Sequence, residues 1–268
     1  MNIKELEDKA NYIRDEVIRV ACKNNLGHIA PSLSTVDILV ALYYQIMNPF
    51  ALRNELGEHY ALKNGAVWQE RDRLILSKGH GCYALYAILV DLGIIPRTYY
   101  EDDVVYGEDA LKGCVEYKPY RGLEASTGSL GHGLPIAVGI ALALKKKESK
   151  AKVYCILGDG ECQEGTTWES LNFASEHNLF TNLKVIVDEN RLMALESVKL
   201  NERSIRGIHP KTVCEYGHNM EDIIKAIKEY DIIFALTEKG YGLKCMEGEA
   251  KFHYRVPTED ELKKGRTY

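Results

Sequence analysis

Two residues that could bind a metal ion through oxygen each follow a short apolar run in the sequence. Asp159 lies between two glycines directly after the run at 153–157, and Asn190 follows the run at 183–188. The intervening segment has the length of one helical crossover, so the two runs are predicted to be neighbouring parallel strands. Ligands of such sheets bind at the carboxyl edge, where both side chains would then lie.

The chemistry of this pair predicts a site for a hard cation. A carboxylate and an amide carbonyl suit Mg²⁺ or Ca²⁺. Two protein oxygens do not fill an octahedral shell, so a backbone carbonyl, water and a ligand diphosphate are expected to complete it. Gly158 and Gly160 would let the backbone approach that diphosphate closely. A Gly-Asp-Gly sequence alone favours a simple turn capped by its aspartate; the whole segment at 158–190 is more specific.

Strands and helices are predicted to alternate around this pair. Residues 6–20 have the period of an amphipathic helix, and Ser34 and Asp37 form a predicted helix start before a run ending at 47. Strands are predicted at 73–77, 153–157, 183–188 and 231–237, helices at 82–93, 135–147, 166–178 and 220–230, and a short last helix near 258–261. Residues 97–125 are predicted to form a long functional loop. This order predicts one α/β domain over 1–268, with a parallel β-sheet flanked by helices.

The composition argues against several classes of protein. The 268 residues are 46% hydrophobic and 27% charged, which predicts an ordinary core. The net charge of −5 offers no basic stripe for nucleic acid. No run of 18 or more apolar residues is seen, so no membrane span or membrane partner is predicted. The seven cysteines match neither zinc nor redox spacings, which predicts reduced thiols and a cytoplasmic location.

The segment GDGECQEGTTWESLNFASEHNLFTNLKVIVDEN at 158–190 resembles the thiamine diphosphate fingerprint, which begins Gly-Asp-Gly and closes with Asn. Its interior, with Trp168-Glu169 and Asn182-Leu183, resembles the transketolase version. Four other segments resemble the same family in the same order: GHIAPSLSTVDILVALYY, DRLILSKGHGCYALYAIL, STGSLGHGLPIAVGIALA and TEKGYGLKCMEGEAKFHYRVPTEDEL. The resemblance implies the thiamine diphosphate-binding fold and the N-terminal subunit of a split transketolase.

The family's known roles are carried over to the matching positions. The resemblance implies metal binding by the side chains of Asp159 and Asn190 and by the backbone oxygen of Leu192. It implies cofactor binding by His80, Gly128, Ser129, Leu130, Gly158, Gly160, Glu161, Asn190 and His253, with Leu130 as an apolar wall. His28, His80, Glu164 and His253 form the implied catalytic set, in which His28 faces the substrate and Glu164 is a buried residue near the subunit interface.

Each histidine has a simpler interpretation. His28 and His80 both follow glycine, and either could be a loop histidine bonded to the backbone. His253 could be an exposed histidine of a polar segment. His132 stands where the family usually has glutamine and is assigned no catalytic role.

The implied reaction transfers a two-carbon ketol unit from a ketose to an aldose. Thiamine diphosphate stores the electron pair, so the protein mainly positions and polarises. The family's activating glutamate belongs to a second domain, so a separate C-terminal partner subunit is expected. This chain would homodimerise within a heterotetramer and would be inactive alone.

The substrate side departs from the family pattern. Gly113-Cys114-Val115-Glu116 stands where the family has Gly-His-Pro-Glu. A thiol cannot make the charged contact of that histidine, so a non-standard sugar or sugar phosphate is expected. Lys118 and Arg121 are candidate contacts for a phosphate or nucleotide-linked sugar acceptor, and ordinary surface charges are the simpler interpretation of both. Two alternatives stay open: the alpha subunit of a 2-oxoacid dehydrogenase-type thiamine enzyme, and a catalytically inactive cofactor-binding or scaffold subunit.

Overall fold

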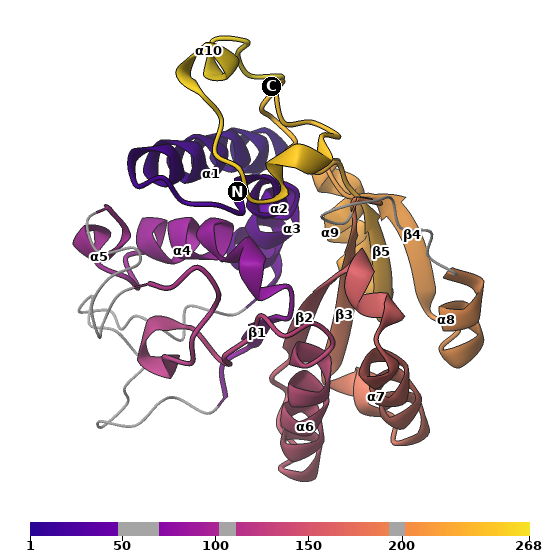
Figure 1. Ribbon diagram of the computed structural model, residues 1–268. Helices are drawn as coiled ribbons and strands as arrows, with labels where there is room; N and C mark the ends of the chain where they lie inside the picture. The colour runs from indigo at the N-terminus through magenta and orange to yellow at the C-terminus, as the bar shows by residue number, and fades with distance from the viewer. Residues whose placement is uncertain (48–69, 102–110, 193–201) are drawn as a thin grey trace.

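A computed structural model describes residues 1–47, 70–101, 111–192 and 202–268. Within these ranges, five parallel strands form one sheet in the order β1-β2-β3-β5-β4 (Figure 1). Their bounds are Arg73–Leu76 for β1, Val153–Gly158 for β2, Leu183–Glu189 for β3, Thr212–Tyr216 for β4 and Ile232–Leu236 for β5. The predicted adjacency of β2 and β3 is confirmed, since Gly158 pairs with Asp188 at the carboxyl end of their ladder.

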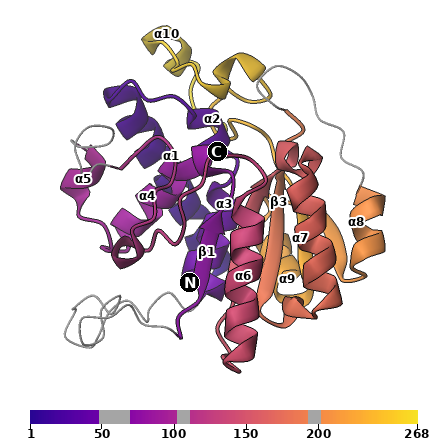
Figure 2. The same ribbon diagram turned by 60° about the horizontal axis from the view of Figure 1, so that its bottom comes forward.

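Helices cover both faces of the sheet, as parallel sheets require. One layer contains α1 (Ile3–Lys23), α2 (Ile29–Leu33), α3 (Val36–Ala41), α4 (Cys82–Asp91) and α9 (Met220–Glu229). The other contains α6 (Gly133–Lys146), α7 (Gly165–Glu176) and α8 (Glu202–Ile208). Figure 2 shows α6 and α7 in front of the strands and α9 behind them. The remaining short helices are α5 (Arg97–Glu101) and α10 (Glu259–Leu262).

Alternate residues along each strand enter different cores. On β2, Tyr154 and Ile156 pack into the layer with α1, whereas Cys155 and Leu157 pack into the layer with α6 and α7. This alternation is the period of two that a strand imposes on its side chains. Both faces are apolar, which is why the strands appear in the sequence as continuous apolar runs.

Most predicted elements are confirmed, and four predictions need correction. The predicted loop at 97–125 contains α5 and a 3₁₀ turn at Pro119–Arg121, while 102–110 lie outside the described residues. The edge strand β4 is absent from the predicted order, because TVCEY is only half-buried and has no apolar run. The helix α8 is absent from it as well. Ser34 does not begin a helix; it ends α2, and its hydroxyl donates to Asp188 Oδ2 at 2.7 Å. The expected continuous helix up to 47 is α3 followed by a π-helical turn at Leu42–Ile46.

One stretch of the described residues, Ile29–Ile46, is long and apolar enough to pass for a membrane-spanning helix by length and composition. It contains α2, α3 and the π-helical turn, and 83% of it is buried inside the protein. This burial fits a core segment, which passes the same test.

Candidate functional site

Four neighbouring strands each place a polar residue just beyond their carboxyl end. Lys78 follows β1, Asp159 follows β2, Asn190 follows β3 and Lys239 follows β5. All four side chains line one cavity of about 360 Å³. The sheet therefore brings Asp159 and Asn190 together at the carboxyl edge, as their positions after the two strands predict.

The two predicted metal ligands are held by the adjoining backbone. Asp159 Oδ1 accepts the Gly160 N–H at 2.8 Å, and its Oδ2 accepts the Arg191 N–H at 2.5 Å. Asn190 Oδ1 accepts the Leu192 N–H at 3.1 Å. Arg191 has a φ of 60°, a left-handed conformation that turns the chain back toward Asp159. Residues 190–192, directly after β3, are thus folded around the Asp159 carboxylate.

Most of the predicted site residues line this cavity, and three do not. The lining residues are His28, Pro31, Lys78, His80, Cys114, Gly128, Leu130, Gly158, Asp159, Gly160, Asn190, Leu192, Lys239 and His253. Ser129, Glu161 and Glu164 are absent from this wall. Ser129 and Glu164 are exposed in this chain, so the expectation of a buried Glu164 does not hold for the chain alone.

Glu161 supports the cavity from behind. Its side chain is 1% exposed and accepts the Gly131 N–H at 2.9 Å and the Gly158 N–H at 2.9 Å. It also accepts the Ser77 hydroxyl at 2.5 Å. Because the 3₁₀ turn after Asp159 directs Glu161 inward, this carboxyl joins three loops of the site. Glu161 thus lies behind the cavity wall rather than in it, and its contact with the cofactor stays a prediction.

Three histidines meet on one side of the cavity. The ring centroids of His28 and His80 are 5.4 Å apart, those of His28 and His253 are 5.4 Å apart, and those of His80 and His253 are 5.5 Å apart. Among the described residues, neither His28 nor His80 bonds to the backbone through its ring, which disfavours the simpler interpretation of both. His28 itself has a left-handed φ of 58°, a sparsely populated conformation found often at functional sites.

Burial and nearby lysines keep these rings neutral. Burial, then Lys78, lowers the pKa of His80 to about 2. Burial, then Lys239, lowers the pKa of His253 to about 4 and lowers that of His28 as well. Before any anion binds, the rings therefore offer N–H groups and lone pairs rather than positive charge. An anion bound beside these rings would raise their pKa values and favour the protonated form.

The two lysines of the site have no predicted role. Lys78 is 1% exposed and forms an ion pair with the fully buried Asp188, while donating to the Pro31 carbonyl at 2.9 Å. Lys239 donates to the Leu192 carbonyl at 2.8 Å and lies 2.8 Å from His253 Nδ1. Burial, then Lys78, lowers the pKa of Lys239 to about 8. The sequence could have indicated both lysines, because each lies just beyond an apolar run that is predicted to be a strand.

Neither candidate phosphate contact reaches this cavity. Arg121 is buried, with its guanidinium 4.2 Å from the centre of the Tyr99 ring. Lys118 lies 4.0 Å from Glu116 and does not line the cavity.

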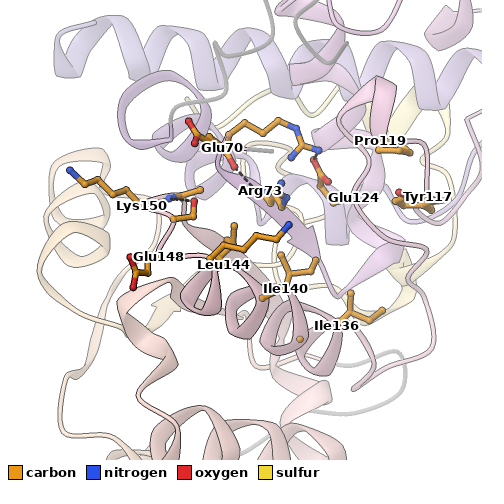
Figure 3. Close-up of a pocket in the computed structure, with 16 residues that line it drawn as sticks. Glu70, Arg73, Tyr117, Pro119, Glu124, Ile136, Ile140, Leu144, Glu148 and Lys150 are labelled. Carbon is orange, nitrogen blue, oxygen red and sulfur yellow. Dashed lines mark hydrogen bonds and ion pairs between the residues drawn. The ribbon is translucent and has the colours of Figure 1, made fainter. Parts of the chain in front are cut away.

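A larger cavity lies elsewhere, at the amino ends of β1 and β2. It has a volume of about 1080 Å³, with Ile136, Ile140 and Leu144 of α6 along one side and Arg73 and Glu124 facing them (Figure 3). No predicted site residue lines it. Size alone therefore does not locate the chemistry; the smaller cavity at the carboxyl edge is the candidate site.

The donor set fits a hard divalent cation. Asp159 is 4% exposed, and burial, then Asp188, raises the pKa of its carboxyl, so a cation would relieve the cost of charging it. A carboxylate, an amide oxygen and the Leu192 carbonyl are all hard ligands. Lys239 donates to that carbonyl, so the carbonyl oxygen is within reach of a group that lines the cavity. In the described part of the chain, no group of three or more His, Cys, Asp or Glu side chains offers another metal site.

Comparisons with known proteins agree with this geometry. Residues 7–266 match the family described as transketolase, thiamine diphosphate binding domain. A subunit of the apulose-4-phosphate transketolase of Actinobacillus succinogenes is 32% identical over 278 residues, covering 98% of this chain and 95% of that protein. A subunit of the 6-deoxy-6-sulfo-D-fructose transketolase of a Clostridium species is 32% identical over 275 residues, covering 97% and 94%.

A solved transketolase from Campylobacter jejuni superposes with a TM-score of 0.82 at 28% identity, covering 98% of this chain and 42% of that one. The chain thus spans under half of a full-length transketolase but nearly all of the relatives named as subunits. The predicted fold and the predicted class, a transketolase-type transferase subunit, are confirmed. The chain belongs to the transketolase family, as a subunit that carries the thiamine diphosphate-binding domain.

Proposed function

We propose that this chain holds the diphosphate end of thiamine diphosphate through Mg²⁺ bound by Asp159, Asn190 and the Leu192 carbonyl. The observation that carries the proposal is the convergence of these three oxygen donors with Lys78 and Lys239 in one cavity. Ca²⁺ is the alternative ion, because the same oxygens suit it.

The remaining polar groups of the cavity would neutralise and orient the diphosphate. Gly158 and Gly160 leave room for the anion beside the backbone, and Gly160 has its N–H at the Asp159 carboxylate. Lys239, with a pKa of about 8, gains a full positive charge when an anion lies beside it. His80 and His253 would donate ring N–H groups to the phosphoryl oxygens.

The other end of the cavity would take the thiamine rings. When bound, the cofactor supplies an electron sink for the two-carbon fragment. Leu130 and Gly128 would supply the apolar side of this end, and His28, which also lines the cavity, would face the thiamine rings there. A neutral histidine there can accept and return a proton of a sugar hydroxyl.

The ring end is open, which supports a role for the partner subunit. Leu130 is 38% exposed, and Ser129 and Glu164 beside it are also exposed. We infer that a separate C-terminal transketolase subunit covers this rim and brings the activating carboxylate, in a heterotetramer where this chain homodimerises. Glu164 would then become buried at the interface, and the chain alone would be inactive.

The cavity wall near Cys114 supports a donor sugar other than xylulose 5-phosphate. Cys114 is half-buried in the cavity wall, and burial raises the pKa of its thiol, so it offers a neutral group. The relatives named above act, by their names, on apulose 4-phosphate and on a sulfonated fructose. We propose a non-standard sugar or sugar phosphate donor. Efficient turnover of xylulose 5-phosphate by the reconstituted enzyme would contradict this.

Two further proposals accompany this function. Residues 1–268 form a single cofactor-binding domain, because one sheet carries both core clusters. The protein is cytoplasmic, in keeping with seven free cysteines.

The experiment is reconstitution with a C-terminal partner subunit. We expect ketol transfer from the pair with thiamine diphosphate and Mg²⁺, and none from either chain alone. Transfer by this chain alone would contradict the split-enzyme proposal. Cofactor binding without any transfer by the pair, over a broad donor screen, would favour the inactive scaffold subunit instead.

A further inference from the structure

The fifth strand of the sheet also places a polar residue beyond its carboxyl end, but this residue does not line the cavity. His218 follows β4, and its side chain is fully buried. Its Nδ1 lies 2.7 Å from Asp37 Oδ2 on α3, and Asp37 in turn forms a buried ion pair with Arg14 on α1. These three residues join two helices to the loop after β4.

The cluster fixes which nitrogen of His218 carries the proton. Burial alone would raise the pKa of Asp37, but Arg14 and His218 together hold it below its usual value. The carboxylate is therefore an acceptor, so Nδ1 carries the hydrogen. Nε2 is left with a lone pair, and it accepts the Glu238 backbone N–H at 2.8 Å. One ring thus donates on one side and accepts on the other.

The accepted N–H belongs to the residue directly before Lys239. The segment from Glu238 to Tyr241 is a tight loop after β5, in which Gly240 has a φ of +82° and donates to the Ala30 carbonyl at 3.1 Å. The Tyr241 ring stacks on His218, with centroids 3.6 Å apart. His218 therefore contacts both ends of the loop whose lysine points into the cavity.

We propose that His218 is a positioning residue for the cofactor site, which fixes Lys239 against the Leu192 carbonyl and His253 by holding the Glu238 N–H. That Lys239 meets the diphosphate rests on the proposed function; that His218 holds Lys239 in place does not. Outer-shell partners of this kind orient the groups that touch a ligand.

Two substitutions separate the two sides of the ring. His218→Gln can place an amide oxygen near Nε2 and keep the acceptor for the Glu238 N–H. His218→Asn can place an amide nitrogen near Nδ1 and keep the Asp37 contact, but it loses that acceptor. Asn11→Ala is a matched control, because Asn11 accepts from Arg14 Nη1 at 3.0 Å without touching the loop.

The experiment measures the loop in the full 268-residue chain. Amide hydrogen exchange reports on the Glu238 N–H, and trace acetylation at pH 8 reports on Lys239, with the exposed Lys146 as internal standard. We expect His218→Asn to accelerate amide exchange at Glu238 and acetylation of Lys239 several-fold. In His218→Gln and Asn11→Ala, both rates should stay near those of the wild type. The proposal would be overturned if His218→Asn and His218→Gln changed the two rates equally, or if His218→Asn changed neither rate. A uniform rise in exchange and acetylation over the whole chain would also overturn it.

Inorganic diphosphate with Mg²⁺ tests the premise separately. It should slow acetylation of Lys239 in the wild-type chain if the lysine meets a diphosphate. A lack of protection would contradict the cofactor role of Lys239, whereas the contrast between Asn and Gln would still decide the role of His218.

Discussion

The two ends of the cofactor cavity differ in how completely this chain builds them. At the diphosphate end, Asp159 is 4% exposed and Lys239 is 2% exposed, and each bonds to groups of the same chain. At the ring end, Leu130 is 38% exposed and Cys114 is half-buried. The difference indicates that this chain preorganises the diphosphate end and leaves the ring end exposed, where we propose that the partner subunit completes the site.

The diphosphate end is preorganised by a buried polar network. Asp188 lies at its centre and is fully buried; it accepts from Lys78, from the Thr237 hydroxyl and from Ser34 Oγ. Lys78 and these hydroxyls hold the pKa of Asp188 below its usual value, although burial opposes this. Four segments of the chain are thus fixed before the cofactor arrives.

The largest expected effect comes from breaking this network. Lys78→Met leaves Asp188 buried without its cation, which should lower the free energy of unfolding by about 3–5 kcal/mol. Urea unfolding measures it, with the exposed Lys146→Met as control. Adding Asp188→Asn to Lys78→Met should restore part of the loss. Equal stability of Lys78→Met and Lys146→Met would mean that the diphosphate end is not preorganised.

A substitution at the ring end should affect activity more than stability. Leu130→Ala should change the free energy of unfolding by less than about 0.5 kcal/mol, because the side chain is partly exposed. Ketol transfer by the complex with the partner should fall about tenfold, since an apolar contact to the cofactor rings is lost. A large loss of stability in Leu130→Ala with normal ketol transfer would contradict the proposed difference between the two ends.

The neutral histidines predict a dependence of stability on pH. The folded pKa values of His80 and His253, about 2 and about 4, lie below the unfolded value of 6.5. The unfolded chain then binds more protons, so stability is lost as the pH falls from 6.5 toward these values. Between pH 6 and pH 5, the wild type should lose about 1 kcal/mol more than His80→Asn. Parallel curves for the two proteins would contradict the lowered pKa.

The smallest effect is expected at Cys114. Cys114→Ala should change the affinity for thiamine diphosphate with Mg²⁺ by less than about threefold, because the thiol is neutral and makes no charged contact. The ratio of turnover between donor sugars should change more. Calorimetry and a donor screen measure the two. A donor ratio equal to that of the wild type would remove Cys114 from sugar recognition.

The sequence predicts the frame of the site better than its inner contacts. The strands β1, β2, β3 and β5 are apolar enough to be found, and the residues after β2 and β3 follow from them. The edge strand β4 is missed because an edge needs fewer apolar residues. The inward direction of Glu161 depends on the 3₁₀ turn after Asp159, which periodicity does not resolve. The roles of Lys78 and Lys239 depend on contacts between segments that are distant in sequence.

The most direct test of the central claim is calorimetric titration of thiamine diphosphate into the chain with its partner subunit, with Mg²⁺ and with EDTA. We predict Mg²⁺-dependent binding by the wild type and a loss of at least about 100-fold in Asp159→Asn. Asp260→Asn, at a well-exposed position, should bind like the wild type. Binding that is the same in Mg²⁺ and EDTA, or unchanged in Asp159→Asn, would contradict the account.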